Sequence, residues 1–224
     1  MKELCLNDLL DLIELYNPEG KEKVKKAYEY AERLHEGQMR QSGEPYISHP
    51  LNVAYILAEM HGDTDTICAG LLHDTLEDTI IKKEDIAHDF NQEVANLVDG
   101  VTKISKLNFS TKQDQNMANT RKIITGITED VRIIIIKLAE RCHNMRTLWA
   151  IPKEKQRLKA KETLEILAPI AHRLGLSYIK AELEELSLKY YKPEAFDQIE
   201  EELNSTKEER DKSSNSDLIL YATI

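Results

Sequence analysis

Two His-Asp pairs, His73-Asp74 and His88-Asp89, carry side chains that bind divalent metal ions in proteins. His88-Asp89 lies in KKEDIAHDFNQE, a segment dense in charge, and this favours a solvated helix end. His73-Asp74 follows the small and apolar segment ICAGLL, where unpaired polar side chains are costly. The first pair is therefore the better metal candidate, although a solvent-exposed polar helix end is its alternative.

The segment HDTLEDT adds two acidic residues to the first pair. If residues 64–78 form one helix, Glu77 lies one turn after His73, and Asp78 lies one turn after Asp74. Four ionisable groups would then converge on one side of the helix, and they would repel or neutralise one another without a cation. This spacing favours a metal ion near His73-Asp74.

Further ligands have to come from other parts of the chain. His49 stands at an expected helix start in PYISHP, where a capping or packed histidine is the more common interpretation. Glu140 directly follows an isoleucine-rich run, which favours an inward orientation, although a lone helical glutamate is usually solvated. Asn144 shares a helix face with Glu140, and Thr147 lies beyond it. These residues are candidates for the same site.

The elements that must position these residues are predicted to be helices. Only 8 Gly and 6 Pro occur in 224 residues, and apolar residues recur at helical spacing. The segment VRIIIIKLAERCHNMRTL contains four consecutive isoleucines, which favour a strand, but no second strand-like run exists to pair with it. We therefore predict a buried helix there. The expected helices span about 5–16, 21–37, 49–61, 64–78, 82–89, 92–105, 112–127, 129–148, 153–173, 176–191 and 194–212.

Composition and charge limit the class of protein. Hydrophobic residues (41%) and charged residues (31%) are balanced as in soluble globular domains, and the formal net charge is −10. An acidic chain argues against nucleic-acid binding, yet a bound metal can make one pocket locally positive for an anion. No apolar run reaches membrane-spanning length, and the N-terminus lacks a signal-peptide pattern. Cys5, Cys68 and Cys142 form no CxxC motif, which suits a reducing cytoplasmic location.

Five segments in combination resemble the hydrolase domain of the Rel/SpoT alarmone enzymes, within the HD phosphohydrolase superfamily. They follow the family's order and spacing over roughly residues 20–190. The resemblance implies an all-α HD-domain helical bundle of about ten to eleven helices over 1–190. Residues 191–224 would be a connecting helix and tail, without the synthetase domain of longer family members. The segments are HEGQMRQSGEPYISHP (35–50), AGLLHDTLEDT (69–79), VANLVDGVTKI (94–104), KLAERCHNMRTL (137–148) and ETLEILAPIAHRLG (162–175).

The resemblance implies metal-dependent hydrolysis of ppGpp or pppGpp at the 3′ position, giving GDP or GTP and pyrophosphate, in the turnover of stringent-response alarmones. The family normally uses Mn2+, and mixed imidazole and carboxylate ligands do not exclude Fe2+ or Zn2+. The implied partners are this nucleotide and, if the natural chain is longer, a synthetase domain in the same chain. The family's metal ligands map onto His49, His73, Asp74 and Glu140, and its Glu-Asp pair that handles the attacking water maps onto Glu77 and Asp78.

Four residues, Arg40, Tyr46, Asn144 and Thr147, map onto the family's substrate-side positions. Arg40 is expected to lie against the guanine base. Lys137 and Arg141 are further candidates for phosphate contacts, although a plain surface charge is the more common interpretation of each. His143 either forms a hydrogen bond at the edge of the site or is simply packed, and packing is favoured. The substrate-side residues are Arg40, Tyr46, Lys137, Arg141, Asn144 and Thr147.

Glu140 departs from the family, whose fourth metal ligand is an aspartate. The extra methylene moves the carboxylate by roughly 1.5 Å, whereas metal–ligand distances vary by only about 0.2 Å. A weaker metal site is therefore expected. Gln41 is a second departure, because many family members carry a basic residue there. Two alternative functions stay open: another HD nucleotide phosphohydrolase, and a nucleotide-binding regulatory module in which Glu140 weakens catalysis.

Overall fold

The computed structural model describes residues 4–106 and 130–203, and these residues contain helices and no β-sheet. The predicted all-α class is therefore confirmed. The expected helix at 112–127 lies outside the described residues, as does the chain after residue 203. The last described segment is helical over 193–203, and this range overlaps the last expected helix, 194–212.

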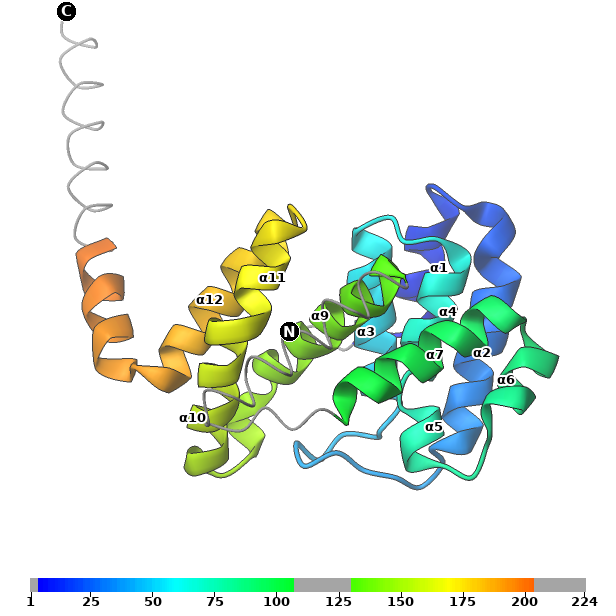
Figure 1. Ribbon diagram of the computed structural model, residues 1–224, viewed down its shortest axis with the longest axis horizontal. Coiled ribbons are helices and arrows are strands. Elements are labelled where there is room, and N and C mark those ends of the chain that lie inside the picture. The colour runs from blue at the N-terminus through cyan, green and yellow to red at the C-terminus, as the bar shows by residue number, and fades with distance from the viewer. Residues whose placement is uncertain (1–3, 107–129, 204–224) are drawn as a thin grey trace, which may run out of the picture.

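The described helices form two parts that share one central helix. In chain order they are α1 (Leu6–Glu14), η1 (Pro18–Gly20), α2 (Lys21–Leu34), α3 (Ser48–Glu59), α4 (Thr64–Leu72), α5 (Thr75–Asp78), α6 (Lys83–Asp89), α7 (Gln92–Ser105), α9 (Val131–Arg146), η2 (Leu148–Ala150), α10 (Lys153–Glu162), η3 (Thr163–Leu167), α11 (Ala168–Arg173) and α12 (Ser177–Tyr191). Figure 1 shows α1 to α7 at one end and α10 to α12 at the other, with α9 between them. Helix α9 contacts α3, α4 and α7 in the first part and α12 in the second.

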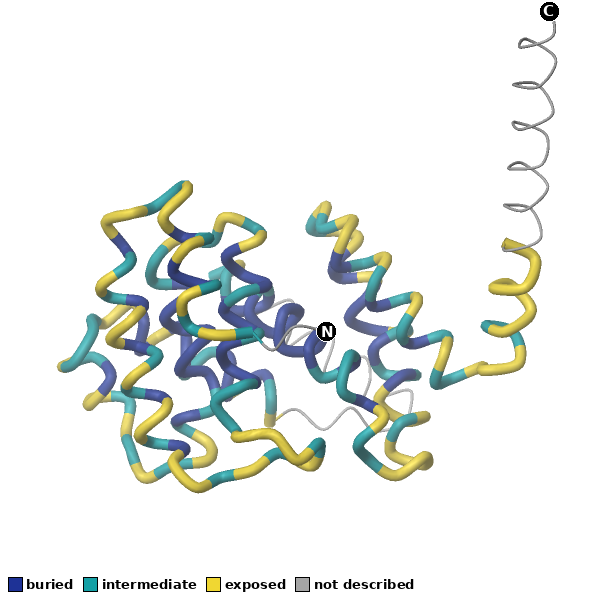
Figure 2. The backbone as a smooth tube through the Cα atoms, turned by 180° about the vertical axis from the view of Figure 1, so that it is seen from behind, coloured by how far each residue is buried: buried dark blue, intermediate teal, exposed yellow. Residues whose placement is uncertain are grey.

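Helix α9 confirms the prediction of a buried helix in the isoleucine-rich segment. Asp130 caps its N-terminus, because the Asp130 side chain accepts a hydrogen bond from the backbone N–H of Arg132 at 2.9 Å. Eleven of its sixteen residues are buried, and Lys137, Glu140 and Arg141 are among them. Figure 2 shows that burial is concentrated in this middle region of the molecule. Charged side chains placed there need partners.

The prediction of a single helix at 64–78 is wrong, because the helix is interrupted in its middle. Helix α4 ends at Leu72 and α5 begins at Thr75, so His73-Asp74 occupy a break between two helices. The Thr75 hydroxyl donates to the Leu72 carbonyl at 2.6 Å, and a side-chain bond of this kind competes with the backbone pattern of a helix. His73 and Asp74 both keep right-handed helical backbone angles, and the Asp74 carbonyl accepts a bond from the backbone N–H of Asp78 at 2.9 Å, so Asp78 still follows Asp74 by one turn.

The predicted helix at 153–173 is also interrupted. Helices α10 and α11 are joined by η3, a stretch of wider π-type helix. Pro169 lies in the first turn of α11 and lacks the backbone N–H that a regular helix would use there. The pattern of apolar residues carries no sign of this change in hydrogen bonding, because the side-chain spacing shifts by only one residue.

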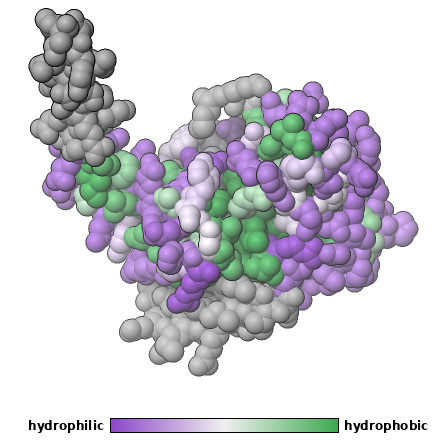
Figure 3. Space-filling view, turned by 90° about the horizontal axis from the view of Figure 1, so that it is seen from above, coloured by the Kyte–Doolittle hydropathy of each residue, from purple (hydrophilic) through white to green (hydrophobic). Residues whose placement is uncertain are grey.

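The surface is largely polar. Seen from above, hydrophilic side chains cover much of the molecule, and hydrophobic ones gather in the middle, between the two parts (Figure 3). Within residues 4–106 and 130–203, no helix has both the length and the apolar character that crossing a membrane requires.

Candidate active site

His49, His73 and Asp74 converge, although they come from separate parts of the chain. His49 lies in the first turn of α3 and is 2% exposed. His73 is equally buried, in the break that it shares with Asp74. One ligand atom of each residue lies within 4.8 Å of the others. We call these three residues the metal cluster.

Both imidazole rings of the metal cluster are oriented by a partner on one nitrogen. His73 Nδ1 lies 2.7 Å from the carbonyl oxygen of Gly70, and His49 Nδ1 lies 2.7 Å from Nδ1 of His143. The other nitrogens face the same carboxylate, because His73 Nε2 lies 3.1 Å from Asp74 Oδ1 and His49 Nε2 lies 3.7 Å from Asp74 Oδ2. His73 Nε2 is buried and has no hydrogen bond with proper geometry to any described residue. A buried nitrogen of this kind is costly unless it binds something, and a cation satisfies it.

The electrostatics of the metal cluster also fit a cation. Burial lowers the pKa of His49 well below its usual value, so this ring is neutral and able to act as a ligand. Burial also opposes protonation of His73, but the adjacent Asp74 carboxylate outweighs it and raises the pKa of His73 to about 9. In turn, although burial opposes it, His73 lowers the pKa of Asp74. The Asp74 carboxylate therefore already stabilises one positive charge, the proton on His73. A metal ion bound there would replace that proton and neutralise the carboxylate.

The family model described as HD domain matches residues 27–177, a stretch that contains the metal cluster. This chain belongs to the HD domain family. The family implies a divalent metal, which the buried histidines and the carboxylate fit. Of the two His-Asp pairs, His73-Asp74 belongs to the metal cluster, and we call it the HD pair; its histidine is buried and its aspartate is half-buried. His88 is 89% exposed at the end of α6, so the predicted solvated position of the second pair is confirmed.

Curated relatives of this HD domain are much longer proteins. A protein of Myxococcus xanthus named GTP pyrophosphokinase is 50% identical over 84% of this chain and 25% of its own length. A guanosine-3′,5′-bis(diphosphate) 3′-pyrophosphohydrolase of Aquifex aeolicus (strain VF5) is 46% identical over 93% of this chain and 29% of its own. The bifunctional (p)ppGpp synthase/hydrolase SpoT of Escherichia coli (strain K12) is 47% identical over 90% and 29%, respectively. This chain thus spans less than a third of each of these relatives.

A solved structure also resembles this HD domain. It is described as "A metazoan ortholog of SpoT hydrolyzes ppGpp and plays a role in starvation responses". The two share 26% sequence identity with a TM-score of 0.56, and the match covers 73% of this chain and 93% of the other. With the bacterial relatives, this match confirms the resemblance to the Rel/SpoT family that the sequence segments indicated.

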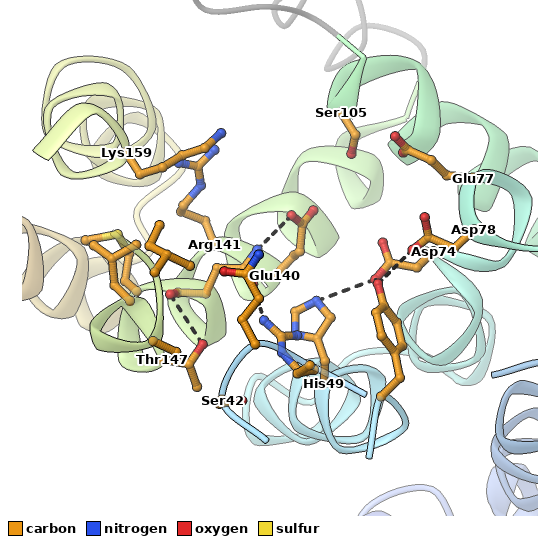
Figure 4. A pocket seen from close by; sticks show the side chains of 18 of the residues that line it. Ser42, His49, Asp74, Glu77, Asp78, Ser105, Glu140, Arg141, Thr147 and Lys159 are labelled. Atoms are coloured by element: carbon orange, nitrogen blue, oxygen red, sulfur yellow. Dashed lines mark hydrogen bonds and ion pairs between the residues drawn. The ribbon is translucent and has the colours of Figure 1, made fainter. Parts of the chain in front are cut away.

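A pocket of about 990 Å³ lies beside the HD pair (Figure 4). In Figure 4, Asp74, Glu77 and Asp78 lie on one side of the pocket, and Arg141 and Lys159 lie on the other. His73 is the single predicted site residue that does not line the pocket. The predicted residues that do line it are Arg40, Tyr46, His49, Asp74, Glu77, Asp78, Lys137, Glu140, Arg141, Asn144 and Thr147.

Glu140, the predicted fourth ligand, lies outside the metal cluster of this HD domain. Its Oε2 accepts a hydrogen bond from Lys137 Nζ at 2.7 Å, and its Oε1 accepts one from Asn144 Nδ2 at 3.1 Å. The predicted inward orientation of Glu140 is confirmed, since the residue is 8% exposed. Its role as a ligand stays a prediction.

The two predicted phosphate-binding cations of the HD domain are buried and paired. Lys137 is 4% exposed and Arg141 is 5% exposed, so neither is the plain surface charge that the sequence left open. Arg141 Nη2 donates to Glu162 Oε1 at 2.6 Å, and its Nη1 donates to Thr163 Oγ1 at 3.2 Å. Carboxylates that also line the pocket balance these two charges, and the pairing fixes the orientation of both cations.

Three neighbours of the predicted residues were not assigned from the sequence. His143, for which packing was favoured, is buried as expected but also contacts His49, so it helps to orient a cluster ring. Ser105 accepts a hydrogen bond from Lys137 at 2.8 Å, and Glu162 pairs with Arg141. The helical spacing around each of these residues carries no signal for contacts between distant parts of the chain.

Tyr46 connects the HD pair to the following acidic pair. Its hydroxyl oxygen lies 2.7 Å from Asp74 Oδ2 and 2.8 Å from Asp78 Oδ2, so the two carboxylates share its single proton. Burial and the Asp74 carboxylate raise the pKa of Tyr46, which keeps the phenol protonated. The ring stacks on His35 at 4.5 Å between centroids. Tyr46 lines the pocket as predicted, but its hydroxyl orients carboxylates and is not free for substrate.

Tyr46→Phe is expected to weaken the binding of a divalent cation by about tenfold, since loss of a hydrogen bond that orients a ligand typically costs 10- to 100-fold. Calorimetric titration of the cation measures this directly. Tyr28→Phe is a matched control, because the Tyr28 hydroxyl also donates to a carboxylate, that of Glu32, and neither residue lines the pocket. Equal cation affinity in the two variants would contradict the role given to the Tyr46 hydroxyl.

Proposed function

We propose that this HD domain hydrolyses ppGpp or pppGpp at the 3′ position, giving GDP or GTP and pyrophosphate. The observation that carries the proposal is one pocket, lined by His49 and Asp74 of the metal cluster and by the acidic pair Glu77-Asp78, that buried cations also line. Relatives named 3′-pyrophosphohydrolase at 46–50% identity support the substrate class. A polyanionic nucleotide suits a pocket that holds both a cation site and positive side chains.

The metal cluster would hold Mn2+ in this proposal. Two imidazole nitrogens and one carboxylate suit Mn2+ or Fe2+ and do not exclude Zn2+. When bound, the ion supplies Lewis acidity and lowers the pKa of water. His49 and His73 are prepared for this by the partners that fix their Nδ1 atoms, and Asp74 is prepared by the Tyr46 hydroxyl.

The acidic pair would position the attacking water and accept its proton. Asp78 is held by Tyr46, whereas the Glu77 carboxylate has no hydrogen bond or ion pair within the described residues. Among the described residues, Glu77 is thus the member of the acidic pair without a bonding partner, and it would take up the proton. Arg40 would lie against the guanine base as a planar cation, and Lys137 would meet phosphate oxygens.

Product analysis tests the proposed reaction. With Mn2+ present, the domain is expected to convert ppGpp to GDP and pppGpp to GTP, with one pyrophosphate released per nucleotide. Deoxynucleoside triphosphates serve as the comparison, because an HD phosphohydrolase of another class would cleave them. Release of orthophosphate, or faster turnover of the deoxynucleotides, would overturn the proposal.

A nucleotide-binding regulatory module is the second candidate. The observation that favours it is the Glu140 carboxylate, which is bound to Lys137 and Asn144 and lies outside the metal cluster. Calorimetry with ppGpp separates the two functions, because a module would bind the nucleotide in saturating Mn2+ without turnover. The free carboxylate of Glu77 favours the enzyme, since a binding module has no need of a proton acceptor.

The domain bounds, a neighbouring synthetase domain and the cellular location are also part of this proposal. We infer that residues 1–190 form the hydrolase unit and that residues 191–224 continue toward a synthetase domain if the natural chain is longer, as expected from relatives of which this chain covers 25% to 29%. A cytoplasmic location matches a nucleotide substrate. Comparing rates of this chain and a longer natural form would show whether the added part inhibits hydrolysis, and equal rates would argue against inhibition.

The affinity for Mn2+ is expected to rise with pH up to about 9. Because Asp74 outweighs burial and raises the pKa of His73 to about 9, the ring carries a proton at neutral pH in the absence of metal. A histidine ligand must be neutral, so binding displaces this proton, and fewer protons compete as pH rises. Calorimetry at pH 7 in buffers of different ionisation enthalpy should show release of about one proton per ion. Heat that is independent of the buffer would contradict this assignment.

A further inference from the structure

A chain of four hydrogen bonds crosses the pocket beside the metal cluster. Arg40 Nη2 donates to Asn144 Oδ1 at 2.9 Å, and Asn144 Nδ2 donates to Glu140 Oε1 at 3.1 Å. Lys137 Nζ donates both to Glu140 Oε2 at 2.7 Å and to Ser105 Oγ at 2.8 Å. The chain links the segment before α3, the middle of α9 and the end of α7.

Glu140 is the centre of this chain. Lys137 precedes it by three residues and Asn144 follows it by four, so all three lie on one face of α9. Each carboxylate oxygen of Glu140 accepts a bond from a different neighbour. Both Lys137 and Glu140 are buried, and a buried ammonium group needs its counter-charge. If Glu140 turned to a metal ion, Lys137 would keep Ser105 as its one hydrogen-bonding partner among the described residues.

The metal cluster offers three ligand atoms without Glu140. Its two imidazole nitrogens and one carboxylate oxygen lie within 4.8 Å of one another, and the Glu140 carboxylate is not part of that group. Three protein ligands are enough for an ion that keeps open positions for water and substrate. Binding of an ion by the cluster therefore does not require the longer side chain at position 140.

We propose that Glu140 positions the substrate-binding cations and does not ligate the metal. It holds Lys137 directly and Arg40 through Asn144, so that both cations face the pocket in fixed orientations. The inference has two halves. The substrate half, that Glu140 positions cations which bind substrate, rests on the proposed hydrolase function. The metal half, that Glu140 does not ligate the metal, concerns Mn2+ alone and does not rest on that function.

Calorimetric titration with Mn2+ tests the metal half. Glu140→Gln is expected to change Kd by less than about fivefold, whereas Asp74→Asn should lose more than about 100-fold, the upper range for disturbed metal sites. Glu165→Gln is the control, since Glu165 is exposed, pairs with Lys161 at 3.8 Å and does not line the pocket. A loss of more than about fivefold in Glu140→Gln alone would show that Glu140 is a ligand.

A second variant protects this test against misfolding. Lys137→Met combined with Glu140→Gln removes both members of the buried pair, and replacing a whole buried pair is tolerated better than breaking it. The double variant is expected to keep the Mn2+ affinity of the wild type within the same limit. A larger loss there would also overturn the metal half.

Steady-state kinetics with ppGpp test the substrate half. Glu140→Gln is expected to raise KM by about tenfold with kcat within about threefold of wild type, because cations that act in binding are misplaced. Lys137→Met should raise KM similarly, and the double variant should add little to the larger single effect, as residues in one network do. A fall in kcat at unchanged KM, or fully additive effects, would overturn this half. If wild type does not hydrolyse ppGpp, the proposed function and the substrate half fail together, while the Mn2+ titration still decides the metal half.

Discussion

Asp74→Asn is expected to abolish metal-dependent pyrophosphate release, with a loss of at least about 10³-fold. Asp74 is the carboxylate that both cluster imidazoles face, and it is oriented by the Tyr46 hydroxyl. The asparagine amide keeps the shape but removes the negative charge that a divalent cation needs. A metal ion supplies several kcal/mol of transition-state stabilisation, and each 1.4 kcal/mol is about tenfold in rate.

The second His-Asp pair provides a matched control for this experiment. Asp89→Asn makes the same chemical change next to a histidine, but His88-Asp89 lies at the exposed end of α6, away from the pocket. Asp89→Asn should keep wild-type rates and Mn2+ affinity. Pyrophosphate release and Mn2+ calorimetry on both variants measure the outcome. Wild-type turnover in Asp74→Asn would remove the catalytic assignment of the HD pair.

The helical elements were predictable where their signal is local. The helical spacing of apolar residues predicted helices at 92–105 and 176–191. These ranges are close to the observed α7 (Gln92–Ser105) and α12 (Ser177–Tyr191). The break at His73-Asp74 was missed, because the side-chain bond from Thr75 leaves the apolar pattern unchanged. A periodicity argument therefore finds a helix but does not detect a polar interruption within it.

The site was predictable as a set of residues and less so as a set of contacts. The shared helix face of Glu140 and Asn144 follows from four-residue spacing, and the 3.1 Å bond between them confirms it. The contact between His49 and His143 joins residues 94 positions apart, and it depends on how α3 packs against α9. Sequence spacing carries no information on such packing. For this reason the orientation of a cluster ring by His143 was underestimated.

Among the described residues, Glu77 differs from the other acidic residues of the pocket because its carboxylate has no hydrogen-bonding or ion-pair partner. Asp78 is held by Tyr46, and Glu140 is held by Lys137. Within the described residues, the Glu77 carboxylate has no side-chain hydrogen bond or ion pair, although it lines the pocket beside Asp74. A general base has to lie within reach of the water that it deprotonates. Glu77 is exposed and lines the pocket, so water reaches its carboxylate.

Glu77→Gln is accordingly expected to lower kcat for ppGpp hydrolysis by about 10²- to 10⁴-fold, the usual contribution of a general base. Glutamine keeps the size of the side chain and cannot accept the proton, so Mn2+ affinity should stay at the wild-type value. Stopped assays of pyrophosphate release and Mn2+ calorimetry give the two numbers, and Glu84→Gln on the exposed face of α6 is the control. If Glu77→Gln keeps the wild-type kcat, Glu77 is not the general base, and Asp78 is the remaining member of the acidic pair that could accept the proton. A variant that loses Mn2+ as well would place Glu77 among the metal ligands, since a residue that only moves protons leaves the metal bound.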